Sequence, residues 1–300
     1  AGRGLTFPLR LAGTNQPDDY RYSSSASWSR DAVFGLSGYS ISTVRGGSIS
    51  VRTNDFFGID NSHDRISLLS SGGQAILSSN NISARREEVA GFENLTRYEL
   101  ALPHPQAQID LQLDIPADSP PLSLQGLILE RSEPGLLYHA TGVNGASFRS
   151  FAANPDFFRQ ITALQTDLII VSLGTNDAQG NYRAENFRRE MSSFMTALRR
   201  ELPDTPVLFT LAPDTNKRGR TNGDVYHVNN EIKRYAEAND CAWWDLANLM
   251  GGRGSIRQWK NQALAANDYL HFSPKGYMLQ GYLLYQAILK SYNTHTENPR

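Results

Sequence analysis

The sequence predicts an α/β protein: a three-layer α/β/α parallel sheet whose chain is interrupted by an inserted antiparallel β-sandwich of jelly-roll-like pattern. Two observations predict this fold. Residues 30–118 contain short runs in which apolar and polar residues alternate. After residue 124, continuous apolar runs alternate with segments whose apolar residues recur at helical spacing. The segment DSPPLS, residues 118–123, separates the two patterns and is typical of a domain edge.

The inserted sandwich is predicted from runs in which every second residue is apolar. SISVRT places Ile49 and Val51 in phase, and the runs RYELAL and QIDLQLDI repeat the pattern further along the chain. Clusters of Gly, Asn and Ser separate these runs. This arrangement is typical of antiparallel strands that bury one face.

The second pattern predicts strands and helices in turn. The expected strands are LQGLILE, GLLYHATG, DLIIVSLG (167–174), TPVLFTLAP (205–213) and the start of CAWWDLANLM. The expected helices are ENFRREMSSFMTALRREL (185–202), VNNEIKRYAEAND and PKGYMLQGYLLYQAILKSY, the last with Pro274 near its first turn. Strands that alternate with helices favour a parallel sheet covered on both faces.

The composition argues against several classes of binding partner. Hydrophobic residues make up 40% and charged residues 20% of the 300 residues, which predicts a packed core. The net charge of −1 and the lack of a basic run argue against nucleic acid. No apolar run reaches the roughly 18 residues of a membrane span, and no spacing suits a metal, so we expect no membrane span and no metal. The single cysteine, Cys241, is expected to be a buried, inert thiol.

Three polar or glycine-rich loops lie where an α/β sheet binds ligands, beyond the carboxyl ends of strands. They are GTND (174–177), GVNGA (142–146) and DYLH (268–271). A histidine that acts as general base needs its far ring nitrogen held by an acceptor, and Asp268 precedes His271 by three residues. Asn176 and the amide of Gly145 are candidate donors to an oxyanion. Taken singly, GTND can be a strand-capping turn, and Asp268 can cap the turn before Pro274.

Together, GTND, GVNGA and DYLHFSPKGY resemble blocks III, II and V of the SGNH hydrolases, also called GDSL-type esterases. The resemblance implies a flavodoxin-like three-layer fold and no cofactor. It also implies that Asn176 and Gly145 hold the oxyanion, that His271 is the catalytic base and that Asp268 orients it.

A subgroup resemblance adds the domain organisation. MGGRGSIRQW, the CAWWDL strand and the β-rich segment before block II are similar to bacterial peptidoglycan O-acetylesterases. That resemblance implies a hydrolase domain of residues 1–29 and 119–300. It also implies a carbohydrate-binding-module-like insert of residues 30–118, and a secreted or periplasmic protein.

The sequence departs from the family at block I, the Gly-Asp-Ser motif whose serine is the nucleophile. That motif does not occur in the 300 residues, and the nearest string is Gly223-Asp224-Val225. No Gly-x-Ser-x-Gly elbow occurs either. AGRGLTFPLRLAGTNQPDDY resembles the segment located after block I and its helix in this subgroup. We therefore expect the first strand, the nucleophile and the first helix upstream of Ala1, in a preceding segment of the same protein.

These inferences favour a serine esterase that O-deacetylates a cell-wall or plant polysaccharide by acyl transfer. Its substrate is expected to be an acetylated polysaccharide or a small ester. Two alternatives stay open: a non-catalytic carbohydrate-binding or surface interaction protein on a degenerate SGNH scaffold, and a lipase or thioesterase of the same family. A Gly-Asp-Ser followed by a helix, upstream of Ala1, would favour the enzyme.

Overall fold

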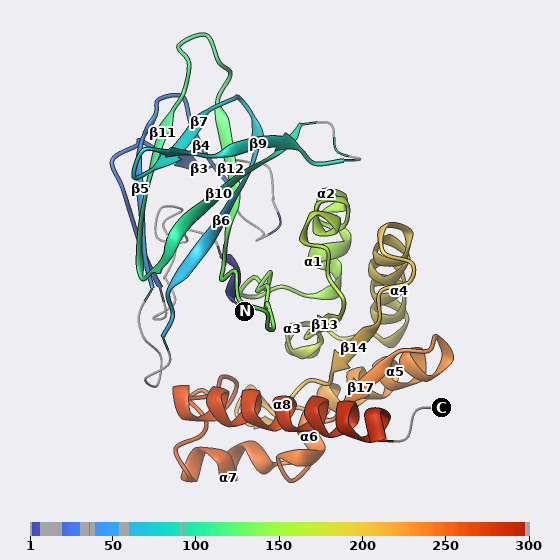
Figure 1. Cartoon of the computed structure of the whole chain (residues 1–300). Coiled ribbons are helices and arrows are strands. Elements are labelled where there is room, and N and C mark those ends of the chain that lie inside the picture. The colour runs from blue at the N-terminus through green and yellow to red at the C-terminus, as the bar shows by residue number, and fades with distance from the viewer. Residues whose placement is uncertain are drawn as a thin grey trace. The chain divides into compact units, whose positions relative to one another are not determined.

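The chain divides into two compact units in the computed structural model, which describes residues 2–6, 20–30, 36, 40–53, 60–90, 92 and 94–297 (Figure 1). The first unit, Ala1–Asn144 with Asn154–Gln165, is called the β unit here. The second, Gly145–Ala153 with Thr166–Arg300, is called the α/β unit.

The β unit is built from two antiparallel sheets. One has seven strands in the order β3-β4-β12-β6-β10-β9, with β1 also paired to β12, and the other has five in the order β2-β5-β11-β7-β8. The strands of the first sheet are β1 (Gly2–Thr6), β3 (Ser29–Arg30), β4 (Ile41–Thr43), β6 (His63–Gly72), β9 (Arg85–Glu88), β10 (Leu95–Gln106) and β12 (Leu122–Glu130). Those of the second are β2 (Tyr20–Ser24), β5 (Gly47–Thr53), β7 (Ile76–Ser79), β8 (Ile82–Ser83) and β11 (Gln108–Asp114). The unit also contains α2 (Pro155–Gln160) and the 3₁₀ helix η1 (Ile161–Leu164).

One apolar cluster joins the two sheets face to face. Ile49 and Val51 of β5 are fully buried, as their alternation predicts, and so is Leu113 of β11. The cluster also takes Ile66 and Leu68 from β6 in the other sheet. Alternate residues from facing sheets therefore form the core of a sandwich.

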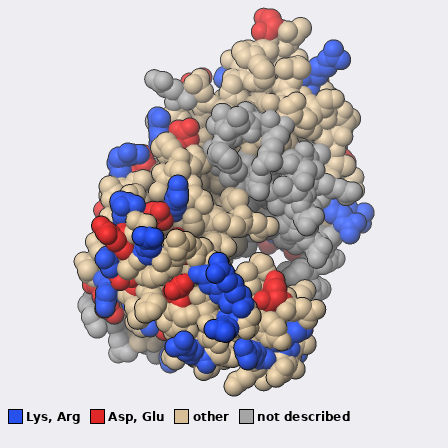
Figure 2. All heavy atoms as spheres, turned by 180° about the vertical axis from the view of Figure 1, so that it is seen from behind, with Lys and Arg blue, Asp and Glu red and all other residues tan. Residues whose placement is uncertain are grey.

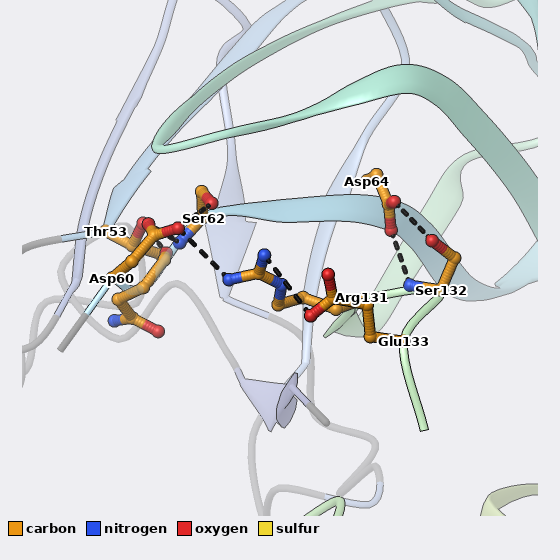
Figure 3. A network of polar contacts seen from close by, with 8 residues as sticks. Thr53, Asp60, Ser62, Asp64, Arg131, Ser132 and Glu133 are labelled. Carbon is orange, nitrogen blue, oxygen red and sulfur yellow. Dashed lines mark hydrogen bonds and ion pairs between the residues drawn. The ribbon is translucent and has the colours of Figure 1, made fainter. Parts of the chain in front are cut away.

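A polar network ties the end of β12 to the start of β6 (Figure 3). Asp64 accepts hydrogen bonds from the amide and the hydroxyl of Ser132, at 2.7 and 2.6 Å. Arg131 donates to Asp60 at 3.1 Å, and Asp60 also accepts from the amide and the hydroxyl of Ser62. Burial would raise the pKa of Asp64, but the two hydrogen bonds from Ser132 outweigh it and lower the pKa. The ionised carboxylate thus holds the chain where it leaves the sandwich.

The predicted domain boundaries need correction. The run LQGLILE was expected in the parallel sheet, but as β12 it runs antiparallel to β4 and β6 inside the sandwich. Strands β1 and β2, from the expected hydrolase segment 1–29, also pair within the sandwich sheets, as does β3, which spans the predicted boundary. Residues 7–19 of that segment lie outside the described part. The predicted boundaries at 29/30 and 118/119 therefore fall inside the β unit. A continuous apolar run indicates a strand buried on both faces, and it does not distinguish between two kinds of sheet.

The expected strand GLLYHATG is also wrong. No strand is formed between β12 and α1 in the described chain, and Leu136 and Tyr138 are exposed. The stretch has only a single bridge position, at Leu137, and an apolar run that makes so few backbone hydrogen bonds gains little from the extended conformation.

The α/β unit contains a parallel sheet in the order β13-β14-β17. Its strands are β13 (Ile169–Val171), β14 (Val207–Thr210) and β17 (Ala242–Trp244), with a small hairpin of β15 (Asn216–Lys217) and β16 (Arg220–Thr221). Its helices are α1 (Phe148–Ala152), α3 (Thr175–Gln179), α4 (Ala184–Glu201), α5 (Asp224–Ala238), α6 (Leu246–Leu249), α7 (Ser255–Asn261) and α8 (Pro274–Glu297).

Helices cover both faces of this sheet. Phe209 of β14 packs edge-to-face on Tyr235 of α5, whereas its neighbour Leu208 packs in a cluster with Leu283 of α8. Successive side chains of a strand point to opposite faces, so α5 and α8 lie on opposite sides. The predicted fold class, an α/β protein with a helix-covered parallel sheet and an antiparallel β part, is confirmed.

The apolar residues at helical spacing in 185–202 are all buried, as the predicted helix requires: Phe187, Met191, Phe194, Met195 and Leu198. Cys241 is half-buried, and its sulfur lies 3.6 Å from a guanidinium nitrogen of Arg199. On the face drawn in Figure 2, positive and negative side chains are interspersed, in keeping with the net charge of −1.

Candidate active site

Asp268 and His271 are in contact in the loop before α8. Nδ1 of His271 lies 2.7 Å from Oδ2 of Asp268. The other carboxylate oxygen, Oδ1, accepts the backbone amides of Leu270 and His271, each at 3.0 Å. The aspartate therefore caps the loop with one oxygen and holds the imidazole with the other.

The protonation of this pair follows from the hydrogen bonds. Burial raises the pKa of Asp268, but the bonds from the His271 ring and from the two amides outweigh it and lower the pKa to about 2. An ionised carboxylate can only accept, so Nδ1 carries the shared proton. In the neutral ring Nε2 is then unprotonated, and the His271 side chain is 63% exposed. This tautomer suits a general base.

The loop geometry has local causes. Tyr269 adopts a left-handed φ of 55°, and its carbonyl accepts the amide of Asn216 at 2.9 Å. Pro274 opens α8, and the Ser273 hydroxyl accepts the amide of Gly276 at 3.1 Å, as a helix cap. A Cβ on Gly276 would lie 1.9 Å from the carbonyl oxygen of Leu264, so only glycine fits this close approach.

Asn176 lies in α3, directly after the turn at the end of β13. The turn requires a glycine, because Gly174 has φ of 113° and its missing Cβ would meet Val228 at 2.9 Å. Nδ2 of Asn176 donates to the carbonyl of Ala146 at 2.8 Å. Gly145, the residue before, has φ of 77°, again a conformation that favours glycine. The structure therefore brings GTND and GVNGA together.

Asp177 was not singled out from the sequence, although it is the last residue of GTND. Its Oδ1 accepts the amide of Phe148, the first residue of α1, at 3.3 Å. Its Oδ2 is buried and has no hydrogen-bond partner among the described residues. Burial raises the pKa of this carboxyl to about 6, and Glu190 adds to the shift, whereas the Phe148 amide opposes it. Neighbouring side chains of α3 thus hold both Ala146 and Phe148.

The hairpin β15–β16 connects α3 to the Asp268–His271 loop. Nε2 of Gln179, at the end of α3, donates to Oγ1 of Thr215 at 3.2 Å and to the carbonyl of Asn216 at 2.9 Å. The amide of Asn216 in turn bonds Tyr269. Asn176 and His271, distant in sequence, are therefore held on one hydrogen-bonded frame.

Metal ligation and membrane spanning have no candidate residues in the described chain. Within the described ranges, no group of three or more His, Cys, Asp or Glu side chains is placed to hold a metal ion. In the same part of the chain, no helix has the length and apolar character needed to cross a bilayer.

Solved structures relate the chain to known proteins, whereas no curated protein matches it. Among the solved structures, a peptidoglycan O-acetylesterase is 24% identical, with a TM-score of 0.80 over 98% of this chain and 83% of its own. That likeness shows the fold.

Two further solved structures match about half of the chain. An acetyl xylan esterase is 18% identical with a TM-score of 0.41, over 51% of this chain and 81% of its own. The esterase EstA from Pseudoalteromonas sp. is 14% identical with a TM-score of 0.41, over 53% of this chain and 79% of its own. Residues 123–279, just over half of the sequence, match the model of the GDSL-like Lipase/Acylhydrolase family, and the chain belongs to that family.

Proposed function

We propose that this chain carries the acid–base pair and two oxyanion donors of an SGNH-type serine esterase that removes acetyl groups from a polysaccharide. The observation that carries the proposal is the 2.7 Å contact of Asp268 with Nδ1 of His271, in a chain of an acylhydrolase family. This contact leaves Nε2 as the base.

The reaction is an acyl transfer in two steps. A serine hydroxyl passes its proton to Nε2 of His271 while its oxygen attacks the acetyl carbonyl, and the sugar oxygen leaves with that proton. Water then attacks the acetyl-serine by the reverse proton route and releases acetate. Asp268 stabilises the imidazolium in both steps, and no cofactor takes part.

Asn176 and Gly145 are the proposed oxyanion donors in this chain. One N–H of the Asn176 amide is engaged with Ala146, which fixes the side chain and leaves its second N–H for the substrate. Nothing lies within 4 Å of the position of a Cβ on Gly145, so a carbonyl oxygen can approach this backbone.

The nucleophile belongs, in this proposal, to a segment that precedes Ala1. Two observations support this placement besides the missing Gly-Asp-Ser. β13 pairs only with β14 among the described strands, and a parallel strand on its other edge would end beside the GTND turn. Helix α8 also exposes a row of large apolar side chains suited to cover by a further element: Tyr277, Met278, Tyr282, Tyr285, Ile288 and Tyr292.

Ser147, the serine nearest to Gly145, has another role. Its hydroxyl accepts the amide of Ser150 at 3.3 Å and contacts the Ser150 hydroxyl at 3.1 Å, which makes it the cap of α1. A fluorophosphonate probe combined with mass spectrometry tests the placement. We expect no labelled serine in residues 1–300 and a labelled serine in a protein that includes the preceding segment. A label on Ser147 would refute it.

The substrate class is the finer part of the proposal. The similar peptidoglycan O-acetylesterase supports an acetylated cell-wall polysaccharide as the substrate. A plant polysaccharide is the other substrate in the proposal, and the proposed location is secreted or periplasmic. The β unit would then hold glycan. Acetate release from O-acetylated peptidoglycan and from acetylated xylan, compared with an aryl acetate, tests this. Turnover of long-chain acyl esters alone would favour a lipase.

Because the 300 residues contain no Gly-Asp-Ser motif, a second function is also proposed: a glycan-binding protein without catalysis. Binding of glycan by a longer protein that neither takes the probe nor releases acetate would favour that reading.

A further inference from the structure

A cavity of about 380 Å³ lies between the start of α4 and the side of α5, within the α/β unit. Its lining residues are Tyr182, Ala184, His227, Asn230, Glu231 and Arg234. None of them takes part in the proposed acyl transfer. Three chemical features of this cavity indicate what it can hold.

The first feature is an aromatic wall. The rings of Tyr182 and His227 are nearly parallel, at 9°, with centroids 6.2 Å apart, and His227 is exposed. Phe187 supports the Tyr182 ring from the α4 side, with centroids 6.0 Å apart. Both Tyr182 and His227 line the cavity, so their rings offer aromatic surface to a ligand.

The second feature is a hydroxyl without a partner. The Oη atom of Tyr182 is buried and makes no hydrogen bond with any described residue. A buried tyrosine hydroxyl normally has a partner, because leaving it without one costs about 1–3 kcal/mol. Because this atom has no contact with solvent, a ligand hydroxyl can meet that requirement only after the Tyr182 side chain shifts toward the cavity.

The third feature is a rim of balanced charge. Glu231 is paired with Arg188 at 3.0 Å and with Arg234 at 3.4 Å. Asn230, which is exposed, adds an amide that both donates and accepts. These planar groups offer donors and acceptors without a strong field of one sign, which favours a neutral ligand rich in hydroxyls.

We propose that this cavity is a sugar-binding subsite, which holds a neutral pyranose unit of the glycan against Tyr182 and His227. The inference rests on the proposed function for its polymeric substrate. Tyr182 lies six residues after Asn176, and the amide of Gly180 bonds the carbonyl of Asn176 at 3.0 Å. Six residues span at most about 20 Å, so a glycan of a few units could occupy both sites.

The test is binding, measured by saturation-transfer NMR and calorimetry on a protein that includes the preceding segment. The probes are chitotetraose for cell-wall glycans and xylotetraose for plant glycans, neither of them O-acetylated. Tyr182→Ala should weaken binding of the preferred probe about tenfold, the loss expected for one aromatic contact. Tyr182→Phe, which keeps the ring and removes Oη, should have a smaller effect.

Two further variants guard against misfolding. Asn230→Ala changes an exposed rim residue and should also weaken binding. Tyr285→Ala removes an exposed tyrosine on α8 and should leave binding unchanged. Circular dichroism melts confirm that each variant is folded.

The outcomes separate this inference from the proposed function. Equal binding by wild type, Tyr182→Ala and Asn230→Ala, or no binding of either tetraose at millimolar concentration, overturns the subsite. If the longer protein still releases acetate, the esterase proposal survives that result. Loss of binding in Tyr182→Ala without any esterase activity in the longer protein would support the subsite and overturn the esterase.

Discussion

Replacing Asp177 by Asn should change how the stability of the α/β unit depends on pH. Burial raises the pKa of this carboxyl from 3.8 to about 6, so the folded state holds its proton where the unfolded chain has lost it. Between those two pH values the folded state binds more protons, and its stability falls as the pH rises. The folded state therefore bears the cost of a buried charge at neutral pH.

The pKa shift sets the size of the effect. A difference of about two pKa units corresponds to about 3 kcal/mol, because each unit is 1.36 kcal/mol. Asn has the same shape and its Oδ1 can still accept the Phe148 amide, but it cannot ionise. The variant should gain stability relative to wild type as pH rises from 4 to 7, by up to about 10 °C in Tm.

Thermal melts of both proteins at closely spaced pH values measure this difference. If the new amide destabilises the protein equally at every pH, the difference in Tm between variant and wild type shifts by a constant. Its dependence on pH does not change. Asp240→Asn, at an exposed left-handed position that asparagine tolerates, is the matched control and should give a flat difference. A flat curve for Asp177→Asn from pH 4 to 7.5 would show that burial does not oppose ionisation there.

Four other substitutions test the site and the two units. His271→Ala, in a protein that includes the preceding segment, should lower kcat by roughly three orders of magnitude, since base and nucleophile act as a unit; turnover near wild type would remove His271 from the mechanism. Asn176→Ala should cost about 10²–10³ in kcat with KM little changed, and a rise in KM alone would make it a substrate-binding residue. Asp64→Ala should lower the free energy of unfolding by roughly 2–5 kcal/mol in urea titrations, because two donors of Ser132 lose their acceptor; the exposed Asp118→Ala is the control, and equal effects would contradict the role of the network. Gly276→Ala should lower Tm far more than Gly281→Ala, since a Cβ at 276 meets Leu264 and one at 281 meets nothing within 4 Å, and similar Tm values would contradict this packing.

Some features of this protein are determined by short stretches of sequence. The in-phase residues Ile49 and Val51 are buried, because a strand presents alternate side chains to one face. Helix α4 buries its five predicted apolar residues because side chains three or four positions apart lie on one face of a helix. The contact of Asp268 with His271 is local as well, since residues three apart lie on one turn. In each case the determining interactions lie within a few residues.

Other features depend on contacts between distant segments. LQGLILE is apolar throughout, and only its pairing with β4 and β6 decided that it is a sandwich strand. Residues 20–24 belong to the β unit because they pair with β5, and no local pattern in the sequence indicated this pairing.

The candidate site shows the same division. The motifs GTND, GVNGA and DYLH could be recognised in the sequence, whereas the frame that joins them could not. Asn176 meets Ala146 across 30 positions, and Asn216 reaches Tyr269 across a still longer separation. The buried oxygen of Asp177 and the wall of Tyr182 and His227 likewise arise only when separate helices pack. Sequence alone determined which residue types were available for catalysis. The tertiary structure decided which of them meet, because burial and long-range hydrogen bonds exist only after the chain has folded.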